Sequence, residues 1–142
     1  MVLEFFAAAI AVLALDQATK TLVLARLRPE RAVTGTARSG PFLRLVVNGR
    51  PAFGCLRSRR ALVLAWGLVA VGLLPLVWMP AFHDAGARVG LGVGLGGATG
   101  NVIDRVARDG VVDFIDLRVW PVFNLADVAI VCGVAAVAWF GL

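Results

Sequence analysis

Two aspartates, Asp113 and Asp127, are the residues of this chain best suited to chemistry. They lie at the edges of its last two apolar segments, and a carboxylate at the centre of a bilayer costs roughly 2.5–3.5 kcal/mol on insertion scales. Two carboxylates that lie close together share one proton. Such a pair can hydrolyse a peptide: one carboxylate takes a proton from water, while the other polarises the carbonyl and protonates the leaving nitrogen.

Other hydrolytic chemistries have no motif in this sequence. There is no Gly-x-Ser-x-Gly and no His-Glu-x-x-His, which are the patterns of serine hydrolases and zinc peptidases. The single histidine, His83, and the two cysteines, Cys55 and Cys132, do not have metal-ligand spacing. We therefore expect neither a metal nor a cofactor.

The composition is that of an integral membrane protein. The chain has 142 residues, of which 60% are hydrophobic and only 16% are charged, against about 45–50% and 25% in soluble domains. The net charge is +5, but the sequence has no aromatic-interleaved basic platform and no nucleic-acid motif, so we expect no nucleic-acid partner. The arginines suit lipid headgroups and loop surfaces. The first 15 residues lack the basic start of a secretory signal, so they predict a retained membrane helix.

The elements that must position the aspartates are four apolar segments, each near the 20 or so residues that a membrane span needs. They lie at roughly 2–25, 61–82, 87–103 and 122–142. The third is rich in glycine at four-residue spacing, which favours close helix packing. The sequence thus predicts an all-α membrane protein with four transmembrane helices, forming a single domain over 1–142.

Four spans determine which segments share a side of the membrane. Segments 26–60 and 104–121 lie on one side, and the turn at 83–86 lies on the other side with both termini. Several polar residues therefore converge at one face: Asp16, Lys20, Asn48, Asp113 and Asp127.

The first long segment is not expected to be helical throughout. Pro and Gly interrupt it, and 42–47 is rich in apolar and β-branched residues, which predicts a small β-containing element at the membrane surface. Such a strand could hold an extended peptide by strand addition. The segment also contains nine arginines, which the positive-inside rule alone would place in the cytoplasm.

Two groups of polar residues support the aspartates. Asp16 and Lys20 share a helix face at i, i+4, either as a neutralised pair or in a direct role at a ligand. Asn101, Asp104 and Arg105 share another face. We expect Asp104 and Arg105 to form a structural ion-pair and hydrogen-bond hub, with the alternative that Arg105 holds an anionic lipid headgroup.

The two aspartates have different neighbours. Asn124 and Asp127 follow Pro121 and are ordinary helix-start residues. That role explains one of them, but not an aspartate followed by fifteen positions without another charge. Asp113 lies between Val112 and Phe114, and apolar neighbours raise the pKa of a carboxyl group.

Four ordered motifs resemble those of the lipoprotein signal peptidase (signal peptidase II) family of bacterial membrane aspartyl peptidases. They are Asp-Gln-Ala-Thr-Lys at 16–20, Gly-Gly-Ala-Thr-Gly-Asn-Val-Ile-Asp-Arg at 96–105, Val-Val-Asp-Phe at 111–114 and Phe-Asn-Leu-Ala-Asp at 123–127. The resemblance covers nearly the whole chain. It implies four transmembrane helices in the bacterial inner membrane, cytoplasmic termini and an active site at the outer face, which overrules the arginine count.

The resemblance also implies an activity and its residues. The substrate would be a lipidated prolipoprotein, cut on the N-terminal side of its diacylglyceryl-modified cysteine by a monomeric enzyme in contact with membrane lipid. The catalytic pair falls on Asp113 and Asp127. The supporting positions around substrate and active site are Asp16, Lys20, Asn48, Asn101, Asp104, Arg105 and Asn124.

The chain departs from the family in its second motif, which usually reads Asn-x-Gly-x-Ala-Phe. Here 48–54 reads Asn-Gly-Arg-Pro-Ala-Phe-Gly, and Pro51 removes a backbone donor. We expect altered backbone contacts to the substrate. Two other functions remain open: a non-catalytic membrane binder or proton- or cation-coupled subunit, and a structural scaffold whose polar positions tolerate alanine.

Overall fold

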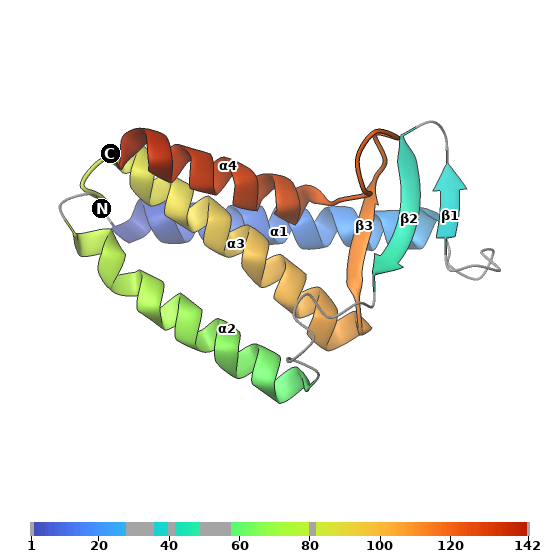
Figure 1. The fold of residues 1–142 in the computed structure, drawn as a ribbon, viewed down its shortest axis with the longest axis horizontal. Coiled ribbons are helices and arrows are strands. Elements are labelled where there is room, and N and C mark those ends of the chain that lie inside the picture. Colours follow the sequence, from blue (N-terminus) through green and yellow to red (C-terminus); the bar gives the residue numbers. More distant parts are fainter. Residues whose placement is uncertain (1, 28–35, 40–41, 49–57, 80–81, 142) are drawn as a thin grey trace.

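The computed structural model of the chain describes residues 2–27, 36–39, 42–48, 58–79 and 82–141. The helices are α1 (Val2–Leu27), α2 (Arg59–Leu73), α3 (Ala85–Arg108) and α4 (Leu125–Phe140), and the 3-10 helix η2 (Leu74–Trp78) continues α2. The strands are β1 (Thr36–Ser39), β2 (Leu43–Asn48) and β3 (Val111–Ile115). The helices run along the long axis of the molecule, with the sheet at one end and both termini at the other (Figure 1).

The helices follow the four apolar segments, with two differences at their ends. α3 continues to Arg108, so Asp104 and Arg105 lie inside the helix. α4 begins only at Leu125, because Asn124 is its N-cap. Among the described residues, α1 and the helix over 59–78 are long and apolar enough to cross a membrane, and α4 is a shorter apolar helix.

Glycines let α3 pack tightly between α1 and α4. A Cβ atom on Gly92 or Gly96 would overlap the backbone carbonyl oxygens of Phe5 and Ala9 in α1. On the opposite side, a Cβ atom on Gly97 would lie 2.6 Å from the carbonyl oxygen of Ala126 in α4. These contacts confirm that the glycines serve close helix packing.

Helix α2 lies apart from this three-helix unit (Figure 1). None of its described side chains is buried, and its two glycines, Gly67 and Gly72, have open space around them. Its exposed residues are largely apolar, such as Leu64 and Leu68. A surface of this kind is expected where lipid is the solvent.

The sheet is antiparallel with the order β1-β2-β3, and β2 confirms the strand predicted at 42–47. A buried cluster of Val23, Leu45, Val112 and Phe114 packs the sheet against the last turns of α1. Because side chains alternate along a strand, this packing turns Asp113 to the opposite face of β3, toward the start of α4.

Candidate active site

Strand β3 holds Asp113 beside the end of α3. The Asp104 Oδ2 atom accepts a hydrogen bond of 3.1 Å from the backbone N–H of Val112. The next residue, Asp113, is opposite Val46 of β2 in the sheet register. The position of the Asp113 carboxylate is therefore determined both by the sheet and by a buried carboxylate of α3.

Asp127 is held by the first turn of α4. The Asn124 Oδ1 atom accepts from the Asp127 N–H at 3.0 Å, and the Asp127 Oδ2 atom accepts from the Asn124 N–H at 3.2 Å. This is a reciprocal capping box. Both residues therefore cap the start of the helix, whereas the sequence pattern explained only one of them by that role.

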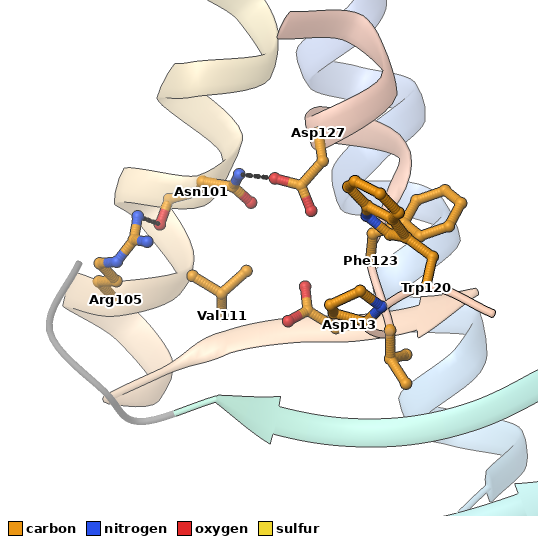
Figure 2. Close-up of a pocket in the computed structure, with 9 residues that line it drawn as sticks. Asn101, Arg105, Val111, Asp113, Trp120, Phe123 and Asp127 are labelled. Carbon is orange, nitrogen blue, oxygen red and sulfur yellow. Dashed lines mark hydrogen bonds between the residues drawn. The ribbon is translucent and has the colours of Figure 1, made fainter. Parts of the chain in front are cut away.

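Two asparagine amides connect the aspartates. Asn101 Nδ2 donates to Asp127 Oδ1 at 2.9 Å, and Asn124 Nδ2 donates to Asp113 Oδ1 at 2.8 Å and to Asn101 Oδ1 at 3.1 Å. Figure 2 shows the Asn101 bond and the side chains of Asp113 and Asp127 pointing into the same space. The two carboxylates, from β3 and α4, thus belong to one hydrogen-bonded cluster.

A fully buried lysine fixes the orientation of the Asn101 amide. Lys20 Nζ lies 2.8 Å from Asp16 Oδ2, 2.8 Å from Asp104 Oδ2 and 3.1 Å from Asn101 Oδ1. These three acceptors match the three donor hydrogens of an ammonium group. Since the Asn101 oxygen faces Lys20, its NH₂ group must face Asp127.

The other carboxylate of α1 ties the start of α4 to this cluster. Asp16 Oδ1 accepts from the backbone N–H of Ala126 at 3.1 Å. Gly100 makes room for Asp16, because a Cβ atom there would overlap the carboxylate. Asp16 and Lys20 form the neutralised pair that was one of their two expected roles.

The expected ion pair between Asp104 and Arg105 is wrong. Asp104 pairs with Lys20 and with Arg108, one helical turn further along α3. Arg105 instead donates to the carbonyl oxygen of Asn101 at 3.3 Å, and its Nε atom has no hydrogen-bond partner among the described residues. Adjacent helical residues point about 100° apart, whereas residues at i and i+4 share a face.

Two residues of the network, Gln17 and Arg108, were missed at the sequence level. Gln17 Nε2 donates to Asp16, Asp104 and the Gly100 carbonyl, and Gln17 Oε1 accepts from Arg108 at 3.1 Å. The i, i+4 spacing of Asp104 and Arg108 was the available signal for the arginine. No spacing pattern relates Gln17 to its partners in a different helix.

The aspartates open into a pocket of about 310 Å³. Its polar wall comes from α3 and its apolar wall from the segment before α4 (Figure 2). The lining residues are Asn101, Arg105, Val111, Asp113, Trp120, Pro121, Val122, Phe123 and Asp127. The pocket therefore combines two carboxylates, a guanidinium and an apolar wall, which suits a peptide with an apolar group beside the reacting bond.

The structure brings together all but one of the predicted site residues. Asn48 ends β2, where it is opposite Val111, and its side chain is not among those described. The altered motif that follows it, at 49–54, lies outside the described residues. Among the described residues, no group of three or more His, Cys, Asp or Glu could hold a metal ion.

Burial raises the pKa of Asp113 from its ordinary value of 3.8 to about 6, and the nearby negative charge of Asp127 adds to the rise. The hydrogen bond from Asn124 and the charge of Lys20 act in the opposite direction. Asp113 is thus the member of the pair whose environment favours a bound proton.

The raised pKa predicts that Asp113 makes the fold less stable as the pH rises. Between about pH 4 and pH 6 the folded state keeps a proton that the unfolded chain has lost, so the free energy of unfolding falls across this window. Relative to an Asp113→Asn variant, the wild-type protein should lose up to roughly 3 kcal/mol, since one pKa unit corresponds to about 1.4 kcal/mol. Unfolding in detergent, followed for both proteins from acid to neutral pH, measures this difference. The prediction would be contradicted if the free energy of unfolding of the wild type, relative to that of the variant, stayed constant or increased as the pH rises.

The fold is shared with solved bacterial membrane enzymes. One structure, described as a bacterial membrane enzyme solved at 2.3 Å resolution, has a TM-score of 0.73 and is 26% identical; the match covers 95% of this chain and 85% of that one. A second, at 1.9 Å resolution, also has a TM-score of 0.73 and is 25% identical, with 95% and 90% of the two chains covered. The fold and its apolar helices thus indicate a membrane enzyme.

The family comparison is more specific. Residues 8–142 match the family model described as signal peptidase (SPase) II. The chain is 40% identical to the lipoprotein signal peptidase of Moorella thermoacetica, over 96% of this chain and 91% of that relative. It is 36% identical to that of Halothermothrix orenii, over 87% and 85% of the two chains. The protein belongs to the signal peptidase II family and is therefore a peptidase, as the motif resemblance implied.

Proposed function

We propose that this protein is a membrane aspartyl endopeptidase that removes the signal peptide from prolipoproteins. The cut falls on the N-terminal side of the diacylglyceryl-modified cysteine. The observation that carries the proposal is the pair of carboxylates, Asp113 and Asp127, which reach one pocket from β3 and α4. Both accept hydrogen bonds from Asn124: Asp113 from its side-chain amide and Asp127 from its backbone N–H. Relatives named lipoprotein signal peptidase supply the substrate class.

The hydrogen bonds and the burial of the two aspartates support different roles for them in this proposal. Asp127 accepts N–H donors on both oxygens, from Asn101 and from the Asn124 backbone, which fix the orientation of its carboxyl group toward the pocket. Burial raises the pKa of Asp113 and so favours its protonated form. A substrate that covers the pocket displaces water and strengthens this preference.

The proposed reaction uses the two aspartates in these different roles. Asp127 takes a proton from a water molecule, whose oxygen attacks the scissile carbonyl carbon while protonated Asp113 donates a hydrogen bond to the carbonyl oxygen. In the tetrahedral intermediate a proton reaches the amide nitrogen, the C–N bond breaks, and the products are a carboxylic acid and a free amine. The cycle consumes one water molecule and no cofactor.

We place the chain in the bacterial cytoplasmic membrane as a single domain over 1–142. α1, α2 with η2, α3 and α4 would be its four transmembrane helices, with the termini in the cytoplasm and the sheet at the outer face. The arrangement of the helices along one axis supports this topology (Figure 1). The enzyme would act as a monomer surrounded by lipid.

The remaining site residues surround the substrate in this proposal. Arg105 lines the pocket, and its guanidinium group can donate to a carbonyl oxygen of the substrate or its lipid. Asn48 lies at the end of β2 beside Val111, where an extended signal peptide would enter. Three buried residues support the site without lining the pocket: Lys20, Asp16 and Asp104. They hold the two asparagines and the aspartates in place.

The test uses the purified protein and two versions of one precursor. The diacylglyceryl-modified precursor should yield the free signal peptide in a mass spectrum, and the precursor with an unmodified cysteine should remain largely intact. Binding of the modified precursor without any cleavage would overturn the proposal in favour of a membrane binder. Equal cleavage of both precursors would leave the peptidase assignment standing but reject the requirement for lipid.

A further inference from the structure

Helix α4 is too short to cross a bilayer alone. Its 16 residues rise about 24 Å at 1.5 Å per residue, whereas the hydrocarbon core is about 30 Å thick. Lipid that surrounds α4 must therefore meet another apolar surface of the protein at one end of this helix. The loop that precedes α4, residues 117–121, provides one.

This loop, residues 117–121, lies beyond the start of α4, at the sheet end of the molecule (Figure 1). Its large apolar side chains are exposed. Val119 is 89% exposed, Trp120 is 69% exposed, and Leu117 is also exposed. The exposed ring of Phe42 belongs to the same region, because the Phe42 carbonyl accepts from the Asp116 N–H at 3.0 Å. Four large exposed apolar side chains thus lie near the pocket, and one of them, Trp120, also lines it.

Hydrogen bonds hold the backbone of the loop in place. Ile115 and Phe123 pair at its base through hydrogen bonds of 2.8 and 3.1 Å. Asp116 Oδ1 accepts from the Arg118 N–H at 2.8 Å, and Arg118 has a φ of 64°. A fixed turn therefore holds these apolar side chains away from the protein core.

Tryptophans mark both ends of α4. Trp139, in the last turn of the helix, is 81% exposed, and Trp78 at the end of η2 is exposed on the same side as the termini. Trp120 lies at the opposite end. Exposed tryptophans at two levels are typical of the two interfaces of a bilayer, where the amphipathic ring sits among the headgroups.

We propose that Phe42, Leu117, Val119 and Trp120 form a lipid anchor that inserts into the interfacial layer of the bilayer at the sheet end of the protein. The inference rests on the membrane placement proposed above. The loop joins β3 to α4 and so links the strand of Asp113 to the helix of Asp127. The anchor therefore holds the pocket at the level of the lipid headgroups. The glyceryl-modified cysteine of a lipidated substrate lies at the same level.

Depth-dependent quenching tests the anchor. The probe is a variant in which Trp66, Trp78 and Trp139 are replaced by Phe, leaving Trp120 as the single tryptophan. It is reconstituted into vesicles of phosphatidylcholine and phosphatidylglycerol brominated near the ester, at mid-chain or near the methyl end. Quenching should be strongest for bromine near the ester and weakest near the methyl end, and aqueous iodide should quench weakly.

A second single-tryptophan protein, retaining only Trp139, separates the two proposals. If brominated lipid quenches Trp139 but not Trp120, and iodide quenches Trp120, the anchor is overturned while the membrane placement stands. If brominated lipid quenches neither, both proposals are overturned. Quenching of both tryptophans by shallow bromine supports both.

Charge placed on the loop gives an independent check. In the Trp120-only protein, Val119→Asp should shift the emission of Trp120 to longer wavelength and lower its quenching by shallow bromine severalfold. Val119→Leu is the matched control and should leave both signals unchanged. Identical behaviour of the two variants would overturn the anchor.

Discussion

Replacing Asp113 or Asp127 with asparagine should slow cleavage of a lipidated prolipoprotein by roughly 10³-fold or more, since one proton-transferring group typically contributes 10²–10⁴-fold. Asparagine keeps the shape of the side chain but can neither remove a proton from water nor protonate the leaving nitrogen. At position 127 the amide oxygen can still accept from the Asn124 N–H, and the backbone N–H of residue 127 still donates to Asn124 Oδ1, so the capping box is retained. The variants should therefore remain folded.

Single-turnover cleavage of the modified precursor measures this loss. The matched control is Asp109→Asn, which changes an exposed carboxylate with a φ of 57°, a conformation that asparagine adopts readily. The control should keep nearly full activity. Full activity in either the Asp113 or the Asp127 variant would remove that residue from the catalytic pair.

Replacing Lys20 with methionine should destabilise the fold by about 3–5 kcal/mol, the usual result of removing one partner from a buried ion pair. Lys20 is fully buried between Asp16 and Asp104. Methionine fills a similar volume but leaves Asp16 without its cation. Unfolding in detergent, monitored by helix content, measures the loss.

The matched control is Arg59→Met, which breaks the exposed pair of Arg59 with Asp109 and should cost less than about 1 kcal/mol. A Lys20→Met, Asp16→Asn double variant should recover part of the stability, because it removes the uncompensated charge as well. Lys20→Ala should lower turnover less than either change to the catalytic pair. Equal losses of turnover would instead place Lys20 in the chemical step.

The convergence of the polar residues could be predicted from the sequence because it depends only on the number of apolar segments between them. Four apolar segments place the end of the first and the start of the last at the same face. The structure brings Asp16, Lys20, Asp113 and Asp127 together in this way. Hydropathy and motif order can predict this convergence, because both are read from the order of residues along the chain.

The partners within the cluster could not all be predicted, because they depend on rotation about the helix axes. Asp104 lies next to Arg105 in sequence but pairs with Arg108 and Lys20. Gln17 reaches three acceptors on two helices, which no motif indicates. α4 begins late because Asn124 is used as a cap, and hydropathy alone cannot distinguish a cap from the first helical residue.

The capping box at Asn124 and Asp127 has a consequence for folding. The oxygen that accepts the Asn124 N–H belongs to the proposed base, so the first turn of α4 and the completed site form in the same step. The buried half of the cluster comes largely from α1, and the proposed base comes from α4. A folding chain therefore has no complete cluster until α4 packs beside α1 and α3.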